Sequence, residues 1–182
     1  MPRNHLEDLV AEWYEFRGYF VRRNVAVGKR PNGGWECELD VVAFHPKQHH
    51  LVQIEPSLDA LSWEKREVRY KRKFDAGRKY IPTLFPGMAI PDDIEQIAVL
   101  VFASTTTHKT LGGGRVQLIG ELMQEIFAGL KGKRIASNAV PEHLPILRSF
   151  QFVVEYWKMV CLGLGAAWEK KPLTSKLCGP TT

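Results

Sequence analysis

Hydrophobic residues recur three or four positions apart at the start of the chain, which predicts an amphipathic helix between Asn4 and Gly18. Asn4 is suited to cap this helix, and Glu7 stands at the position that completes a capping box. Gly18 is suited to end it, because glycine tolerates the left-handed backbone that often follows a helix. The chain therefore begins with a helix that packs one face on a core.

Further along, short runs rich in Val, Ile, Leu and Phe predict strands. Three such runs follow one another with only loops between them, over residues 19–27, 35–44 and 51–55. The continuous apolar run 97–103 is typical of a strand that is buried on both faces, and residues 116–119 predict another strand.

Helical spacing returns over residues 62–77, 121–130 and 146–162, and Ser62 is suited to cap the first of these helices. The resulting order is a helix, three strands, a helix, two strands and two helices. A buried strand that is reached through a crossover helix implies an α/β fold with a mixed central sheet covered on both faces.

The length of 182 residues suits a single domain, 1–182, with a core over about residues 4–120 and a helical extension over about residues 121–170. Residues 150–168 are the most apolar window, but one acidic and one basic residue interrupt it. A packed helix explains this window better than a membrane span does. We therefore expect no membrane association, and the segment is a candidate homodimer interface.

The three cysteines, Cys37, Cys161 and Cys178, lie far apart and form no CxxC pair, which argues against a disulfide framework or a cysteine zinc site. The first residues contain no apolar stretch and do not form a signal peptide. A hydrophobic content of 45% with 25% charged residues is typical of a soluble globular protein. Together these features predict a cytoplasmic protein.

Positive charge is concentrated in one segment. The chain has a formal net charge of +5, and residues 62–79 alone carry eight Lys or Arg against three acids. Such a helix predicts a polyanionic partner, most simply nucleic acid, although a solvated helix face also accounts for it. The candidate nucleic-acid-binding residues are Arg66, Arg69, Lys71 and Lys73 of this helix, and Lys29 and Arg30 of a glycine-rich loop that is otherwise a solvated turn.

Two acids, Asp40 and Glu55, lie in apolar strands, where a carboxylate is costly to bury unless a cation takes up its charge. If residues 46–49 form the turn of a hairpin, Asp40 faces Glu55 across it, and opposed Cβ atoms lie roughly 4.5–5.5 Å apart. Alternation adds Gln53 and Ser57 to the same face. A turn one residue longer would break this register. The arrangement predicts a metal-ion site, and the competing interpretation is that both acids only end their strands at the solvent edge.

The order of elements and acids resembles the PD-(D/E)xK nuclease superfamily, which has the restriction-endonuclease-like fold, over roughly residues 4–103. Glu7 lies in a first helix similar to the opening of Mrr-like nucleases, and Asp40, within Glu-Leu-Asp-Val-Val-Ala, matches the acid of the second strand. Glu55 matches the acid of the third strand. The resemblance implies an α-β-β-β-α-β core with additional C-terminal helices, and a nuclease in which Glu7, Asp40 and Glu55 hold Mg²⁺ or Mn²⁺ and the substrate is DNA.

The sequence departs from this pattern at Ser57, which stands where the motif has its lysine. Some members of the superfamily recruit a cation from the following helix instead. We expect Lys65 to supply it, because Lys65 follows the helix start at Ser62 by one turn, with Gln53 or Ser57 supporting the site. Glu67, the one charged residue in the apolar stripe of that helix, either lies at its rim or joins the acidic site. The alternative function is a catalytically lapsed nuclease-fold protein that binds nucleic acid or a protein partner.

Overall fold

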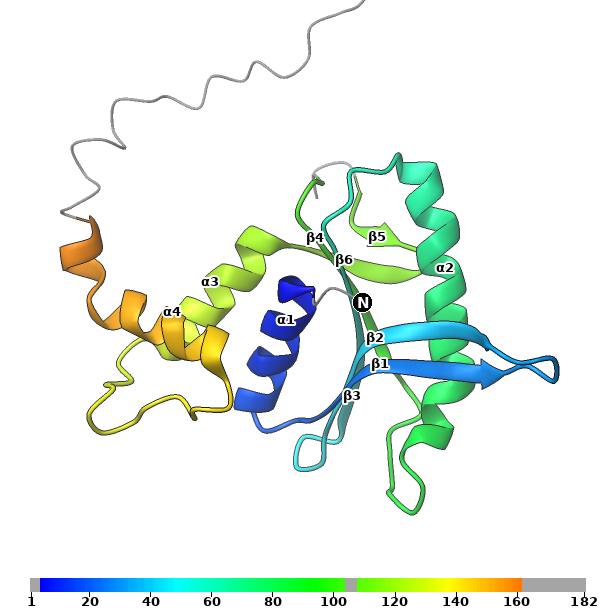
Figure 1. Cartoon of the computed structure of the whole chain (residues 1–182), viewed down its shortest axis with the longest axis horizontal. Coiled ribbons are helices and arrows are strands. Elements are labelled where there is room, and N and C mark those ends of the chain that lie inside the picture. The colour runs from blue at the N-terminus through cyan, green and yellow to red at the C-terminus, as the bar shows by residue number, and fades with distance from the viewer. Residues whose placement is uncertain (1–3, 104–107, 162–182) are drawn as a thin grey trace, which may run out of the picture.

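The computed structural model describes residues 4–103 and 108–161 and consists of a mixed six-stranded sheet with helices on both faces (Figure 1). The strand order is β1-β2-β3-β4-β6-β5. In chain order the elements are α1 (His5–Phe16), β1 (Phe20–Lys29), β2 (Trp35–His45), β3 (His50–Ser57), α2 (Trp63–Tyr80), the 3₁₀ helix η1 (Ile81–Leu84), β4 (Glu95–Leu100), β5 (Thr110–Leu111), β6 (Gly114–Leu118), α3 (Ile119–Leu130) and α4 (Pro145–Glu155).

The sheet is antiparallel at one side and parallel in the middle. Strands β1, β2 and β3 pair antiparallel, β4 runs parallel to both β3 and β6, and β5 pairs antiparallel with β6. Helix α2 makes the crossover between the parallel strands β3 and β4, as such a connection requires. The prediction of an α/β fold with a mixed sheet is therefore confirmed.

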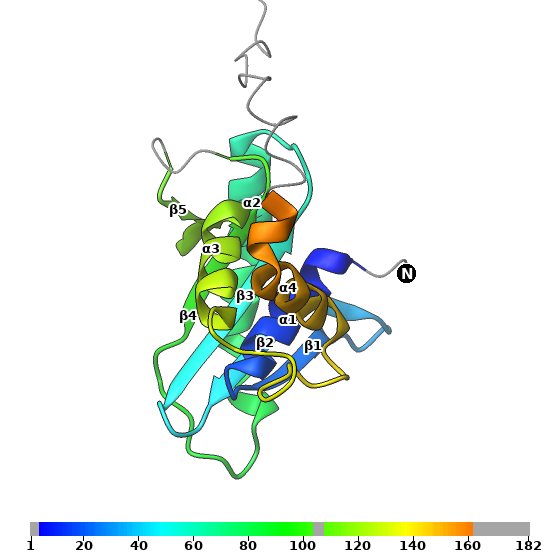
Figure 2. The ribbon, with the colours of Figure 1, turned by 90° about the vertical axis from the view of Figure 1, so that its left-hand side faces the viewer.

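Helices α1, α3 and α4 cover one face of the sheet and α2 covers the other (Figures 1 and 2). The larger core lies under the three helices, where Leu9 and Val10 of α1 pack with Ile126 of α3 and Leu147 of α4. The buried carboxylate of Glu12 accepts a hydrogen bond from the backbone N–H of Leu147 (2.8 Å), so a side chain of α1 caps the start of α4. In the described part of the chain no helix is long and apolar enough to cross a membrane.

Several predicted boundaries were wrong. The strand expected over residues 97–103 is Glu95–Leu100, because the chain turns outward after Leu100. Gly112 and Gly113 form the tight turn between β5 and β6, both at positive φ. The helix expected over 146–162 ends at Glu155 as α4, and its last predicted residue lies outside the described residues. The homodimer through this segment stays a prediction.

The register of the β2–β3 hairpin agrees with the sequence. His45 pairs with His50 around the four-residue turn, and the ladder continues to Val41 and Ile54. The ladder ends one step before Asp40 and Glu55, so the two acids are not a ladder pair, although both contact Lys73. Regular alternation, however, breaks at Asp40, because Leu39 packs in the cluster under α2 whereas Val41 packs in the cluster under α1.

The partner of Asp40 on β1 accounts for this break. Asn24 adopts the left-handed region with a φ of 51° between the pairs that join Arg23 to Val41 and Val25 to Leu39. Asparagine is one of the few residues with a side chain that tolerates this conformation. Such local breaks in a ladder are used to re-aim a side chain, and here the break turns the carboxylate of Asp40 toward α2.

Candidate active site

The pairing of β2 with β3 ends at Val41 and Ile54, and a cavity of about 300 Å³ opens directly beyond. Because the strands part here, helices on both sides of the sheet reach the same cavity. Its walls include Asn4 and Glu7 of α1, Asp40 of β2, Glu55 of β3, and Arg69 and Lys73 of α2. Pro56 also lines it, and its missing N–H removes no bond to β2, since that ladder has already ended.

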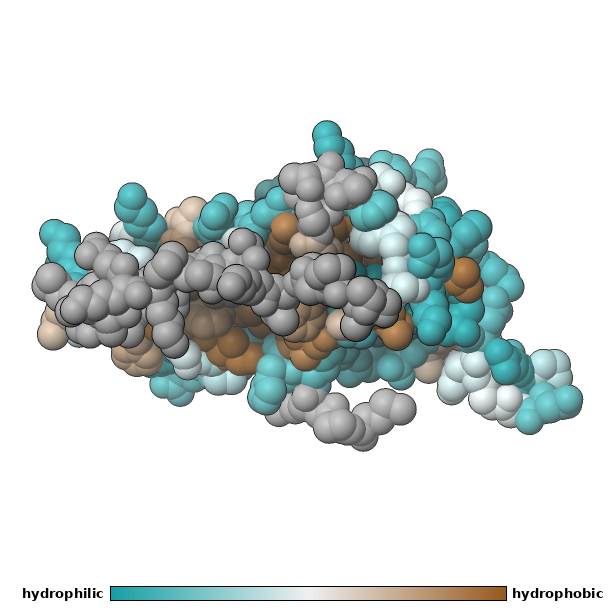
Figure 3. All heavy atoms as spheres, turned by 90° about the horizontal axis from the view of Figure 1, so that it is seen from above, coloured by the Kyte–Doolittle hydropathy of each residue, from teal (hydrophilic) through white to brown (hydrophobic). Residues whose placement is uncertain are grey.

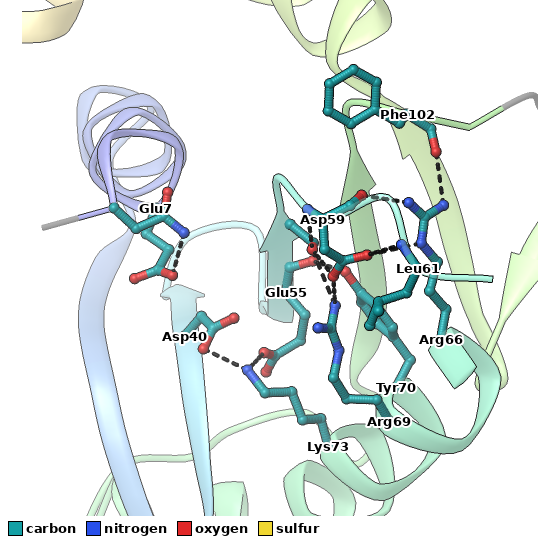
Figure 4. A network of polar contacts seen from close by, with 12 residues as sticks. Glu7, Asp40, Glu55, Asp59, Leu61, Arg66, Arg69, Tyr70, Lys73 and Phe102 are labelled. Carbon is teal, nitrogen blue, oxygen red and sulfur yellow. Dashed lines mark hydrogen bonds and ion pairs between the residues drawn. The ribbon is translucent and has the colours of Figure 1, made fainter. Parts of the chain in front are cut away.

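Lys73 joins the two predicted acids (Figure 4). Its Nζ lies 2.5 Å from Oδ1 of Asp40 and 2.5 Å from Oε2 of Glu55. The Glu55 side chain is almost completely buried, with 1% of its surface exposed. A carboxylate at such depth requires a cation close by, and the ammonium group of Lys73 supplies it.

Gln53 holds the other oxygen of Glu55. Its side-chain amide donates to Oε1 of Glu55 (2.8 Å) and to the backbone carbonyl of Lys73 (3.1 Å). Its carbonyl oxygen accepts a hydrogen bond from Gln96 of β4 (2.8 Å). Gln53 thus holds the carboxylate of Glu55 and the turn of α2 that carries Lys73. This contact is consistent with the expectation that Gln53 supports the site.

The close approach of α2 to Gln53 depends on Gly77. A Cβ atom at position 77 would lie 1.8 Å from Oε1 of Gln53, far inside van der Waals contact. The hydroxyl of Tyr70 donates to the backbone carbonyl of Glu55 (3.2 Å) and ties a second point of α2 to β3.

The pKa values of Glu55 and Lys73 are both raised. Burial, followed by the charge of Asp40, raises the pKa of Glu55 to about 8 despite the opposing effect of Lys73. Burial disfavours the ammonium of Lys73, but the charges of Glu55 and Asp40 outweigh it and raise the pKa of Lys73. Lys73 therefore stays charged at neutral pH, while Glu55 retains affinity for a proton.

Glu7 lines the cavity from the α1 side (Figure 4). The predicted capping box is not formed as expected: the Asn4 side chain does cap the helix by accepting from the N–H of Leu6 (3.1 Å), but Glu7 accepts from the Asn4 side-chain amide (2.6 Å). Partial burial, and secondly the charge of Asp40, raise the pKa of Glu7. The carboxylates of Glu7 and Asp40 therefore act on each other across the cavity.

Ser57 belongs to a second polar cluster beside the carboxylates. Its hydroxyl donates to the carboxylate of Asp59, and Arg69 donates to both Ser57 (3.0 Å) and Asp59. Although burial favours the neutral acid, hydrogen bonds from Ser57, the Leu61 N–H and two arginines hold the pKa of Asp59 well below its usual range. Asp59 thus stays ionised and keeps Arg69 at the cavity.

The prediction that Lys65 lies nearest the carboxylates was wrong. Lys65 is exposed and outside the cavity, whereas Lys73, two turns further along α2, reaches both acids. Lys73 is three residues after Tyr70 and four before Gly77, both of which face the sheet. The sequence could have predicted this position, because residues three or four apart lie side by side on a helix and Lys73 is therefore next to the residues that face the sheet.

The remaining candidate cations have different surroundings. Arg66 is buried and donates to Asp59 and to the carbonyl of Phe102, so it is structural rather than free to clamp a phosphate. Lys71 is exposed and pairs with Asp75. Lys29 and Arg30 are exposed in the β1–β2 hairpin, away from the cavity.

Glu67 does not join the acidic site. Its carboxylate accepts a hydrogen bond from the N–H of Gly112 (2.9 Å) and so fixes the β5–β6 turn against α2. A Cβ atom at Gly112 would lie 2.4 Å from the backbone nitrogen of Lys71, so this turn also depends on a glycine.

The donor chemistry of the cavity fits a hard divalent cation. Within residues 4–103 and 108–161, no three Asp, Glu, His or Cys side chains are grouped closely enough to form a metal site. Mg²⁺, however, is usually held by one or two carboxylates, with water and phosphate completing its shell. Asp40 and Glu55 provide such a pair at the wall of the cavity.

Comparisons of this chain with protein-family models, with curated proteins and with solved structures gave no match. Its function must therefore be argued from the site itself.

Proposed function

We propose that this protein is a metal-dependent nuclease that hydrolyses phosphodiester bonds in DNA. The observation that carries the proposal is the contact of Lys73 with both Asp40 and Glu55 inside a cavity that also contains Glu7. An acid pair on adjacent strands with a lysine beside it is the arrangement that the resemblance to PD-(D/E)xK nucleases implies. Lys73 supplies from α2 the cation that Ser57 cannot supply.

The order of elements supports the finer fold assignment. From α1 to β4 the chain runs α-β-β-β-α-β, with the acids on β2 and β3 at the point where these strands part. We assign this part of the chain to the restriction-endonuclease-like fold, with α3 and α4 as additions after it.

In the proposed reaction Asp40 and Glu55 hold Mg²⁺ or Mn²⁺, with Glu7 close by. When bound, the metal ion stabilises charge on the phosphate and makes a water molecule more acidic. Lys73 orients the attacking water and offsets developing negative charge, and Gln53 keeps Glu55 in place. Arg69 contacts the phosphate next to the one that is cleaved, because its guanidinium already lines the cavity.

The alternative is a protein that keeps the cavity for binding only. It is favoured by Ser57, whose hydroxyl is engaged by Asp59 and Arg69, and by the fact that Lys73 alone already contacts both carboxylates. Such a protein would bind nucleic acid without cleaving it.

The deciding experiment measures cleavage of plasmid and single-stranded DNA in Mg²⁺, Mn²⁺ and EDTA. Asp40→Ala should abolish metal-dependent cleavage and leave the circular dichroism spectrum unchanged. Asp75→Ala, which removes an exposed acid of α2, serves as the matched control and should cleave like the wild type. Equal cleavage by wild type and Asp40→Ala would exclude the assigned site, and binding without cleavage by a folded wild type would establish the alternative.

A further inference from the structure

Three large apolar side chains are exposed on the segments that follow β3 and β4, at the end of the sheet where the cavity lies. Leu58, which lines the cavity itself, is 54% exposed, and Leu61 and Phe102 are 41% and 60% exposed. We refer to Leu58, Leu61 and Phe102 as the apolar rim. Leu58 and Leu61 follow β3, and Phe102 follows the neighbouring strand β4, so the rim lies at one end of the sheet.

The rim is held by a buried arginine (Figure 4). Arg66, which is 4% exposed, donates to the carbonyl oxygen of Phe102 (2.7 Å) and to both the carboxylate (3.1 Å) and the carbonyl of Asp59. The same carboxylate accepts from the N–H of Leu61 (3.1 Å). The backbone of Leu61 and of Phe102 is thus tied to one Arg66–Asp59 pair, and Leu58 directly precedes Asp59 in the chain, while the side chains of all three are exposed.

A fixed apolar surface beside a cavity that contains Arg69 and Lys73 fits a particular form of nucleic acid. In a continuous duplex the base faces are stacked inside, and only sugar and phosphate would meet the rim. An unpaired strand exposes its base faces, which stack on aromatic side chains and pack on apolar ones. Although four acids also line the cavity, Arg69 and Lys73 are the groups there that can contact a phosphate of the same strand.

Building on the proposed function, we propose that the apolar rim binds unpaired bases of the strand whose phosphate enters the cavity. The substrate class is therefore single-stranded nucleic acid, including frayed or single-stranded ends, rather than continuous duplex. Phe102 stacks on a base, and Leu58 packs between that base and the cavity.

Binding tests this inference without cleavage. Fluorescence anisotropy in EDTA compares a labelled oligodeoxythymidine strand with a blunt duplex of equal length. The wild type should prefer the single strand, and Phe102→Ala should weaken single-strand binding by roughly 5- to 150-fold, the range for one lost base–aromatic stack. Leu58→Ser should weaken it less, and both variants should bind duplex as the wild type does.

Val68→Ser is the matched control, because Val68 is an exposed apolar residue of α2 outside the cavity. Equal affinity for strand and duplex, or equal binding by Phe102→Ala and Val68→Ser, overturns the inference. Failure to bind either nucleic acid also overturns the inference, and a protein would then be the expected partner of the apolar rim.

Cleavage separates this inference from the proposed function. Metal-dependent cleavage of duplex and single strand at equal rates, insensitive to Phe102→Ala, would support the nuclease and reject the role of the rim. Single-strand binding that depends on Phe102 without any cleavage would support the rim and reject the nuclease.

Discussion

At the scale of single residues, the site rests on the contact of one ammonium group with two carboxylates of different depth. Asp40 lies at the edge of the cavity, whereas Glu55 is buried and contacts Gln53 and Lys73. A buried charge that loses its partner is costly. Changes to this group should therefore affect both catalysis and stability, and the two effects can be measured separately.

The role of Lys73 is tested by Lys73→Met against Lys65→Ala. Loss of one group that stabilises charge developing in the transition state typically lowers the rate by about 10²–10³-fold, and we expect Lys73→Met to fall in this range in single-turnover cleavage. Lys65→Ala, which removes an exposed cation of the same helix, should change the rate far less. The reverse ranking would restore Lys65 as the catalytic cation.

The pH dependence of stability reports on Glu55. Because the folded-state pKa of Glu55 is raised from 4.5 to about 8, the folded protein binds more protons than the unfolded chain between these values. The contribution of protonated Glu55 to the free energy of unfolding is therefore complete below pH 4.5, and it is lost as the pH rises to about 8. Urea unfolding of wild type should show this decline, and Glu55→Gln, which cannot ionise, should flatten it. Parallel pH profiles for the two proteins would contradict the assignment.

At the scale of elements, α2 determines the site because it approaches β3 closely enough for Lys73 to reach Asp40 and Glu55. The approach depends on Gly77 against Gln53 and on Tyr70 against the β3 backbone. The break in alternation at Asn24 and Asp40 turns one carboxylate toward the same helix. Asp40, Glu55 and Lys73 therefore meet because β2, β3 and α2 pack together, and no single sequence motif contains all three.

Gly77→Ala tests this docking. The added methyl group overlaps Gln53, so we expect a loss of roughly 1–3 kcal/mol in the free energy of unfolding, as is usual for overpacking. In a Gln53→Ala background the same change should cost less, because the clashing atoms are absent. Gly120→Ala on α3 is the control, since a Cβ atom there meets nothing within 4 Å. Equal losses for Gly77→Ala in both backgrounds would show that Gln53 does not set the approach of α2.

At the scale of the whole molecule, the two layers differ in surface character. Seen from above, the side with α2 and the β1–β2 hairpin is largely hydrophilic, and hydrophobic residues gather toward the side of α3 and α4 (Figure 3). The exposed aromatic residues Tyr156 and Trp157 lie on the α4 side. The exposed cations of α2 include Lys65, Lys71, Arg72 and Lys79. Because of these cations, we expect the proposed nucleic acid on the α2 side of the molecule.

Salt dependence of binding tests this orientation. Each lost phosphate contact reduces the slope of log affinity against log salt concentration by about 1. Arg72→Glu, on the exposed face of α2, should weaken binding to single-stranded DNA and lower this slope. Arg134→Glu changes the net charge equally but lies between α3 and α4, so it should have little effect. Equal effects of the two variants would mean that net charge, and not the α2 face, attracts the nucleic acid.

The sequence by itself determined the elements and the proximity of the two acids. Periodic apolar residues and turn residues act locally, so α1, the β2–β3 hairpin and its register were predictable from spacing alone. The register also brought Asp40 and Glu55 to the same end of the hairpin, because a four-residue turn fixes the pairs up to Val41 and Ile54 that directly precede them.

Only the tertiary structure decided which cation meets the acids. Along α2, Lys65 and Lys73 differ in rotation about the helix axis, and the docking of α2 on β3 through Gly77 selects Lys73. In the same arrangement Arg66 and Glu67 do not contact the two acids. Arg66 instead binds the segment after β4, and Glu67 binds the β5–β6 turn. Local pattern specifies which face of a helix is apolar, but the partner of each charged side chain depends on packing between elements that are distant in sequence.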